Sequence, residues 1–131
     1  MSDSVPGSAK KRFPKSRRLL RHSDFERVYK QGRRHFAAHV TVFYLLRDAE
    51  PAQRGPRIGF TVGKALGGAV QRNRIKRRLR EAVRLTGFQG SADVDVVINP
   101  KRSAFDVDFK LLQDEVTRAF QVIEQARQKG K

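Results

Sequence analysis

The segment from Ala69 to Leu85 constrains the fold of this chain more than any other stretch of its sequence. It contains no glycine or proline, and its apolar residues recur at the period of one helical face: Ile75, Leu79, Ala82 and Val83. The remaining positions are mostly cationic. The segment therefore predicts a helix that packs by its apolar stripe and leaves a charged face outside.

Alternation and capping patterns predict the other elements of the domain. We expect two further helices and three strands: a helix over 23–32 that Gly32 closes in a left-handed turn, a long strand from Phe36 to Leu46, strands over 58–62 and 94–98, and a last helix from Asp106. This order predicts an α/β (α+β) two-layer sandwich. It would have a small mixed sheet and three helices, mainly on one face of the sheet, with the other face left open.

The chain has 131 residues, and its 29 Lys and Arg against 13 Asp and Glu give a net charge of +16, which predicts a polyanionic partner. The absence of cysteine excludes a disulfide framework, a thiol nucleophile and a thiolate metal site. The best apolar run, from Val40 to Leu46, is far shorter than a membrane span, and residues 1–16 hold no signal-like apolar run. We therefore expect a cytoplasmic, monomeric protein with no membrane partner: a flexible basic arm over 1–16, a single domain over 17–128 and a tail over 129–131.

The basic charge is concentrated in the first two thirds of the chain. Residues 1–92 hold 22 basic and 6 acidic side chains, whereas residues 93–131 hold 7 of each. On the predicted central helix, polar and cationic residues line the face opposite the apolar stripe, with Lys76 beside them: Asn73, Arg77, Arg80 and Arg84. Arginine offers phosphate a planar, bidentate match, and Gly67 and Gly68 would let an RNA backbone approach the first turn. We interpret this face as a nucleic-acid surface; the alternative is an ordinary solvated face, which usually mixes both signs of charge.

A second candidate surface lies on the sheet face that is predicted to stay open. Phe43 projects away from the Val42 side of its strand, and Phe25 and Tyr29 of the first helix would lie beside it. Aromatic side chains in a positively charged groove commonly stack the bases of single-stranded nucleic acid. The alternative is that these rings belong to the core.

No catalytic or metal-binding constellation stands out in the sequence. The segment over 59–65 has too short a spacing between its glycines for a phosphate-binding loop, and Ala65 replaces the required Ser or Thr. His35 and His39 have the spacing of metal ligands on a helix, but they fall at the start of a predicted strand. The acidic residues are scattered. We therefore expect neither catalytic residues nor a metal site in the protein itself.

Four blocks of sequence, in a fixed order, resemble the protein subunit of bacterial ribonuclease P. They are RHSDFERVYKQG at 21–32, the strand segment at 36–46, RIGFTVGK at 57–64 and AVQRNRIKRRLRE at 69–81, which contains the family's RNR signature. An RNR tripeptide alone is weak evidence, but AVxRNRxKR on a helix that follows an RxGFxVxK strand is specific. The resemblance covers roughly residues 17–123.

The resemblance implies a function that composition does not reveal. In this family a small protein joins a large catalytic RNA, and together they remove the 5′ leader of precursor tRNA by hydrolysing one phosphodiester bond. The RNA carries the chemistry, with Mg²⁺ held mainly by the RNA subunit and the substrate. The implied fold has an unusual left-handed βαβ crossover around the RNR helix, although such crossovers are right-handed in about 98% of cases.

The resemblance also implies roles for individual residues. Contacts with the RNA subunit are expected from Lys64, Arg72, Asn73, Arg74, Lys76, Arg77 and Arg80. Contacts with the single-stranded leader are expected from Phe25, Tyr29, Phe43, Lys76 and Arg80. Ala65 and Gly68 depart from the family pattern, because relatives often carry a second Lys after Lys64 and a polar residue just before the helix.

Two other functions are compatible with the same charge and size. The first is a structural RNA-binding protein of the ribosomal type, which would leave the cleavage of precursor tRNA unchanged when added to the RNA subunit. The second is a protein-only nuclease, which would cleave without RNA and would depend on His39 or Asp95.

Overall fold

The computed structural model describes residues 22–46, 56–86 and 94–129. Its elements follow in the order α2 (His22–Gln31), β2 (Arg33–Phe36), β3 (Val40–Leu46), β4 (Arg57–Phe60), the 3-10 helix η3 (Lys64–Leu66), α3 (Ala69–Thr86), β5 (Val94–Pro100), the 3-10 helix η4 (Arg102–Phe105) and α4 (Phe109–Lys129). The basic arm expected over 1–16, and residues 130–131 of the expected tail, lie outside the described residues.

The strands form one mixed, four-stranded sheet in the order β2-β3-β5-β4. β3 pairs antiparallel with both β2 and β5, whereas β4 pairs parallel with β5. A parallel pair needs a crossover connection, and α3 lies between β4 and β5 in the chain. The sheet and the three α-helices of the described residues confirm the α+β fold class predicted from the sequence.

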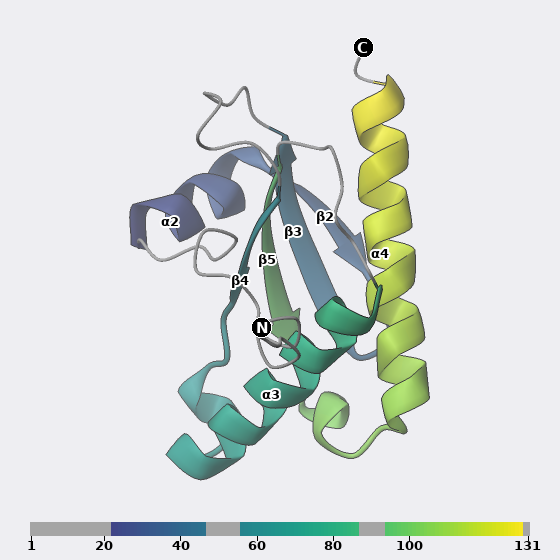
Figure 1. The fold of residues 1–131 in the computed structure, drawn as a ribbon. Helices are drawn as coiled ribbons and strands as arrows, with labels where there is room; N and C mark the ends of the chain where they lie inside the picture. Colours follow the sequence, from purple (N-terminus) through teal and green to yellow (C-terminus); the bar gives the residue numbers. More distant parts are fainter. Residues whose placement is uncertain (1–21, 47–55, 87–93, 130–131) are drawn as a thin grey trace, which may run out of the picture.

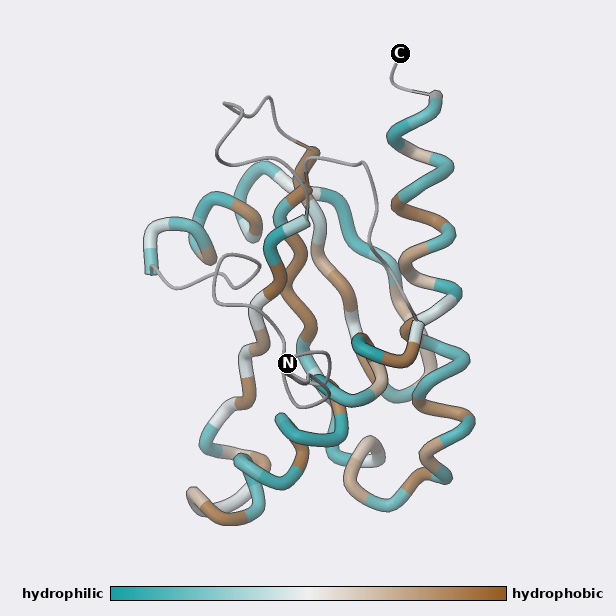
Figure 2. Tube along the Cα trace, in the orientation of Figure 1, coloured by the Kyte–Doolittle hydropathy of each residue, from teal (hydrophilic) through white to brown (hydrophobic). Residues whose placement is uncertain are grey.

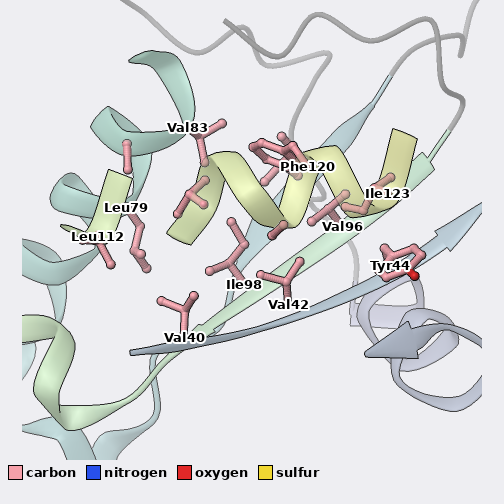
Figure 3. Close-up of a cluster of buried hydrophobic side chains, with 14 of the residues drawn as sticks. Val40, Val42, Tyr44, Leu79, Val83, Val96, Ile98, Leu112, Phe120 and Ile123 are labelled. Atoms are coloured by element: carbon pink, nitrogen blue, oxygen red, sulfur yellow. The ribbon is translucent and has the colours of Figure 1, made fainter. Parts of the chain in front are cut away.

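The main core lies between one face of the sheet and helices α3 and α4 (Figure 3). β3 contributes Val40, Val42 and Tyr44 to this face, as the alternation of the strand predicts. α3 contributes its apolar stripe, whose members are at most 3% exposed: Ile75, Leu79, Ala82 and Val83. The helix therefore packs as its periodicity predicted, and its cationic side is left on the outside.

The second face of the sheet is not left fully open, which corrects the sequence-based expectation. α2 packs on it through Val28, which is buried against Val97 of β5. Figure 1 shows α2 and α4 on opposite sides of the sheet. The amphipathic α2 buries its apolar residues here, because the other face is already filled by α3 and α4.

The long strand predicted from Phe36 to Leu46 is two strands in the structure. β2 ends at Phe36, and the Ala37 amide donates to the Val40 carbonyl at 2.9 Å, so the chain turns and β3 runs back along β2. The composition of 36–46 is β-forming throughout, and the tight turn at 37–39 carries no Gly or Pro to mark it.

Two element boundaries also differ from the expectation. Gly32 ends α2 without a left-handed conformation; among the described glycines only Gly67 has a positive φ, of 132°. Glycine is needed at 32 for close packing, since a Cβ would lie 2.5 Å from the Val28 carbonyl oxygen and 2.6 Å from that of Tyr44. The last helix starts at Phe109 and not at Asp106, because the chain first forms η4.

Polar residues interrupt the apolar ones along α2, α3 and α4 (Figure 2). Among the helices of the described ranges, none has the length and apolar character needed to span a bilayer.

Candidate RNA-binding site

The outward side of α3 presents four cations and one amide, which we call the cationic face of α3: Asn73, Arg74, Lys76, Arg77 and Arg80. All of these residues are exposed except Lys76, which is half-buried, as is Arg72 one helical turn earlier. Within the described residues, no carboxylate forms an ion pair with any cation of this face. The positive charge of the face is therefore not neutralised inside this part of the chain.

Arg84 does not extend the cationic face, although its helical position predicted that it would. Its Nε donates to Glu81 Oε1 at 3.0 Å, and its Nη2 also donates to the same carboxylate. This hydrogen bond raises the pKa of Arg84 above its usual value. The face therefore ends at Arg80, one helical turn earlier than expected.

Arg78 has a structural role within the same basic run. Its guanidinium donates to the backbone carbonyl of Ala104 at 3.2 Å and to those of Phe105 and Val107. It also lies over the ring of Phe109, 6.0 Å from the centroid. Arg78 therefore binds α3 to the segment between η4 and α4, where carbonyl groups need a donor.

The entrance to α3 is built from η3 and two glycines. Gly67 adopts φ 132°, a conformation that other residues rarely adopt, and the Gly68 amide donates to Gln71 Oε1 at 3.0 Å. Lys64 is exposed in η3. The backbone carbonyl of Ala65 accepts from Arg102 Nη2 at 2.8 Å. A cation therefore lies at this entrance even though Ala65 supplies none.

The aromatic residues predicted on the second sheet face lie together. The rings of Tyr29 and Phe43 meet edge to face, with centroids 4.8 Å apart and planes at 87°, and Phe25 packs in the same cluster. The Tyr29 hydroxyl lies 2.9 Å from Thr61 Oγ1 and 3.1 Å from Asn99 Oδ1. The three rings are half-buried. The cluster therefore packs partly against the fold and remains partly open to solvent.

Lys76 and Arg80, also predicted to contact the leader, lie on a different layer. α3 packs on the sheet face that carries Val42, whereas the aromatic cluster lies on the face that carries Phe43. The structure thus brings Phe25, Tyr29 and Phe43 into one group and keeps the two cations on α3 apart from it.

The sequence-based prediction missed other residues on the aromatic face. The guanidinium of Arg34 lies over the Phe43 ring, 5.5 Å from its centroid, and Phe36 follows on the same strand. Thr61 and Asn99 fix the Tyr29 hydroxyl. The period-two pattern of 33–36 could have revealed Arg34, but only if the hairpin between β2 and β3 had been recognised.

Buried charges hold α2 against the sheet. Asp95 of β5 is fully buried; it accepts from Arg57 Nε at 2.9 Å and Nη2 at 2.8 Å, and from Arg27 Nη2 at 3.2 Å. Arg27 also donates to Asp24 at 3.0 Å. The hydrogen bond that Arg57 donates to Asp95 raises the pKa of Arg57, against the opposing effect of burial. This network joins α2, β4 and β5 beneath the aromatic cluster.

The residues proposed for a protein-only nuclease have other partners in the structure. Asp95 is enclosed by arginines, and His39 contacts Glu115 of α4 through both its ring Nδ1 and its backbone amide. In the described ranges, no three His, Asp or Glu side chains gather as a metal-binding group. The geometry of these side chains fits roles in packing α4 and α2 onto the sheet.

Comparison with known proteins decides the family. The sequence profile of the family described as Ribonuclease P matches residues 13–124, which is most of the chain. This chain belongs to the ribonuclease P protein family. It is 38% identical over 99 residues to the ribonuclease P protein component of Finegoldia magna, covering 76% of this chain and 83% of that protein. It is 34% identical over 111 residues to that of Dictyoglomus thermophilum, covering 83% and 89%.

Solved structures of ribonuclease P proteins share the fold. The Staphylococcus aureus RNase P protein superposes with a TM-score of 0.68 at 26% identity, covering 82% of this chain and 94% of that one. The Thermotoga maritima RNase P protein shows the same fold at 24% identity, with a TM-score of 0.66 and coverage of 78% and 93%. The protein is thus the ribonuclease P protein component of tRNA processing, and the ribosomal-type alternative is not favoured.

Proposed function

We propose that this ribonuclease P protein binds the catalytic RNA subunit through the cationic face of α3 and holds the 5′ leader of precursor tRNA on the aromatic face of the sheet. The observation that carries the proposal is the set of cations on α3 that form no ion pair with a carboxylate of the described residues. Elsewhere in the described chain, arginines such as Arg27, Arg57 and Arg127 have carboxylate partners.

Repulsion between the like charges on the cationic face of α3 lowers the stability of the free protein. Arg74, Arg77 and Arg80 follow one another at three-residue steps, Arg80 also lies four residues after Lys76, and like charges at such spacing cost a few tenths of a kcal/mol per pair. Phosphate groups of an RNA would remove this repulsion, and guanidinium groups bind them in a bidentate manner. The helix is therefore more favourable in a complex with RNA than alone.

The protein acts on the reaction by position and charge. Its cations neutralise phosphates where the leader and the RNA subunit come close, which raises the affinity for precursor tRNA. The hydrolysis belongs to the RNA subunit, and Mg²⁺ is held mainly by that RNA and the substrate. The partners of His39 and Asp95 within the fold support this division of labour. We expect the protein to act in the cytoplasm, together with precursor tRNA.

Cleavage of precursor tRNA at low Mg²⁺ tests the proposed function. Adding the protein to its RNA subunit is expected to raise kcat/KM at least about tenfold, equivalent to roughly 1.4 kcal/mol. Rigorously RNA-free protein is expected to show no cleavage. Equal rates with and without the protein would contradict the proposal, and cleavage by the protein alone would establish the nuclease alternative.

The role of the aromatic face predicts a selective effect of Tyr29. Tyr29→Ala is expected to weaken binding of precursor tRNA to the holoenzyme by about 1–3 kcal/mol, the usual contribution of one base–aromatic stack. Binding of mature tRNA, which has no leader, should change little. Tyr29→Phe keeps the ring and loses only the contacts to Thr61 and Asn99, so it is the matched control. Equal losses for precursor and mature tRNA would refute the assignment.

A further inference from the structure

We propose that Phe36 and Arg34 on the edge strand β2 form an additional stacking site for the leader, beyond the cluster around Tyr29. This inference rests on the proposed function, because it assigns a further part of the same strand of RNA to a further part of the same sheet face.

The strand register places both residues on the aromatic face. Arg34 pairs with Phe43 and Phe36 pairs with Thr41 across β2 and β3, and paired residues share a face of the sheet. The position of the Arg34 guanidinium over the Phe43 ring confirms this side for β2. Phe36, two residues further on, projects the same way.

The exposure of Phe36 distinguishes it from the other rings of this face. It is 67% exposed, whereas Phe25, Tyr29 and Phe43 are half-buried and pack on one another. Among the described residues, the other large exposed apolar side chains are aliphatic and lie on helices: Val70, Leu85 and Leu111. Phe36 therefore offers a free ring surface that the fold itself does not use.

A continuous row of side chains joins Phe36 to Tyr29. Phe36 lies opposite Thr41, and Thr41 lies opposite Asn99 of β5. Asn99 is in contact with the Tyr29 hydroxyl. A strand of RNA that stacks on the cluster around Tyr29 would cross this row to reach Phe36, so the two sites lie on one path across the sheet.

The charge of β2 identifies the occupant as single-stranded RNA. Its sequence is RRHF, with Arg33 and Arg34 exposed and no acidic residue. An apolar protein partner on this face would have to remove water from the guanidinium of Arg34, which is costly without a paired charge. RNA supplies a base for the ring of Phe36 and a phosphate for Arg34. In the part of the chain that the structure describes, β2 is hydrogen-bonded only to β3, and no further strand lies past Phe36.

Leader length separates this site from the cluster around Tyr29. The experiment measures binding of the holoenzyme to two precursor tRNAs, one with a long leader and one truncated to the nucleotides next to the cleavage site. Phe36→Ala is expected to weaken binding of the long-leader substrate about tenfold, within the range for one lost stack, and to leave the short-leader substrate unchanged. Phe36→Tyr should retain the affinity. Leu111→Ala removes another exposed apolar side chain, 52% exposed on α4, and should change neither substrate.

The outcomes distinguish this inference from the function on which it rests. If Tyr29→Ala weakens precursor binding but Phe36→Ala does not, the site on β2 is refuted, whereas binding of the leader to the cluster around Tyr29 is supported. If neither change has an effect, the leader does not bind to the aromatic face of the sheet, and the proposed function itself is refuted. An equal loss on short and long leaders would also overturn the site. The same holds if Phe36→Ala only dissolves a dimer seen by sedimentation, since Phe36 would then be a contact between copies.

Discussion

Replacing Asp95 with alanine is expected to lower the free energy of unfolding by about 3–5 kcal/mol, the range found when one partner of a buried ion pair is removed. The carboxylate is fully buried and accepts hydrogen bonds from both Arg57 and Arg27. Without it, Arg57, whose side chain is only 22% exposed, would lose both of its hydrogen bonds to Asp95 and keep the more distant carboxylate of Asp24, at 3.7 Å. Urea denaturation of the free protein measures this change.

Asp114→Ala is the matched control for this prediction. Asp114 also pairs with a cation, Lys110, at 3.3 Å, but both side chains are more than half exposed. Exposed pairs contribute little, so the free energy of unfolding should change by less than about 0.5 kcal/mol. A loss below about 1 kcal/mol for Asp95→Ala would show that the buried network contributes no more than a surface pair.

The loss of Asp95 should also weaken the binding of the leader to the cluster around Tyr29. Arg27 belongs to α2, the helix that carries Phe25 and Tyr29, and it is joined through Asp95 to Arg57 of β4. Without Asp95, α2 loses the link from Arg27 to the sheet and keeps a longer one, from Asp24 to Arg57 at 3.7 Å, together with the Tyr29 hydroxyl contacts and the packing of Val28. Precursor binding by the variant, measured under conditions where it is still folded, should therefore weaken more than the binding of mature tRNA.

The elements with strong periodicity could be predicted from the sequence. Ile75, Leu79, Ala82 and Val83 fixed both the helical state of α3 and the side that is buried. The alternation around Val42 and Phe43 assigned the two faces of β3 correctly, and thereby placed Phe43 with Phe25 and Tyr29. In each case the pattern is local, and the period alone determines which side chains share a face.

The remaining features depend on contacts between distant residues. Asp95 lies between valines, and its partners Arg57 and Arg27 lie 38 and 68 residues away in the sequence. The turn between β2 and β3 contains no Gly or Pro that would predict a hairpin. The sequence therefore did not place Arg34 and Phe36 on the aromatic face. Helical spacing also does not reveal that Glu81 forms an ion pair with Arg84.

Arg77→Ala is expected to weaken binding of the RNA subunit by about 1–3 kcal/mol without a measurable change in unfolding. Arg77 is exposed on α3 and forms no ion pair within the described residues, so its removal costs the free protein nothing. If it contacts a phosphate, the slope of log K against log salt should become shallower by roughly 0.7–0.9. Filter binding across a salt series and thermal unfolding of the free protein measure the two effects.

The neighbouring Arg78→Ala should behave in the opposite way, which makes it a sharp control. Arg78 donates to the carbonyls of Ala104, Phe105 and Val107, so its loss should lower the free energy of unfolding by about 2–3 kcal/mol. Its guanidinium is directed at the protein, and the salt slope of RNA binding by the folded variant should remain that of the wild type. Both residues have the same charge and lie side by side in sequence. If Arg77→Ala unfolds the protein, or if both variants lose the same RNA affinity and salt slope, then the cationic face of α3 is not the surface that meets the RNA.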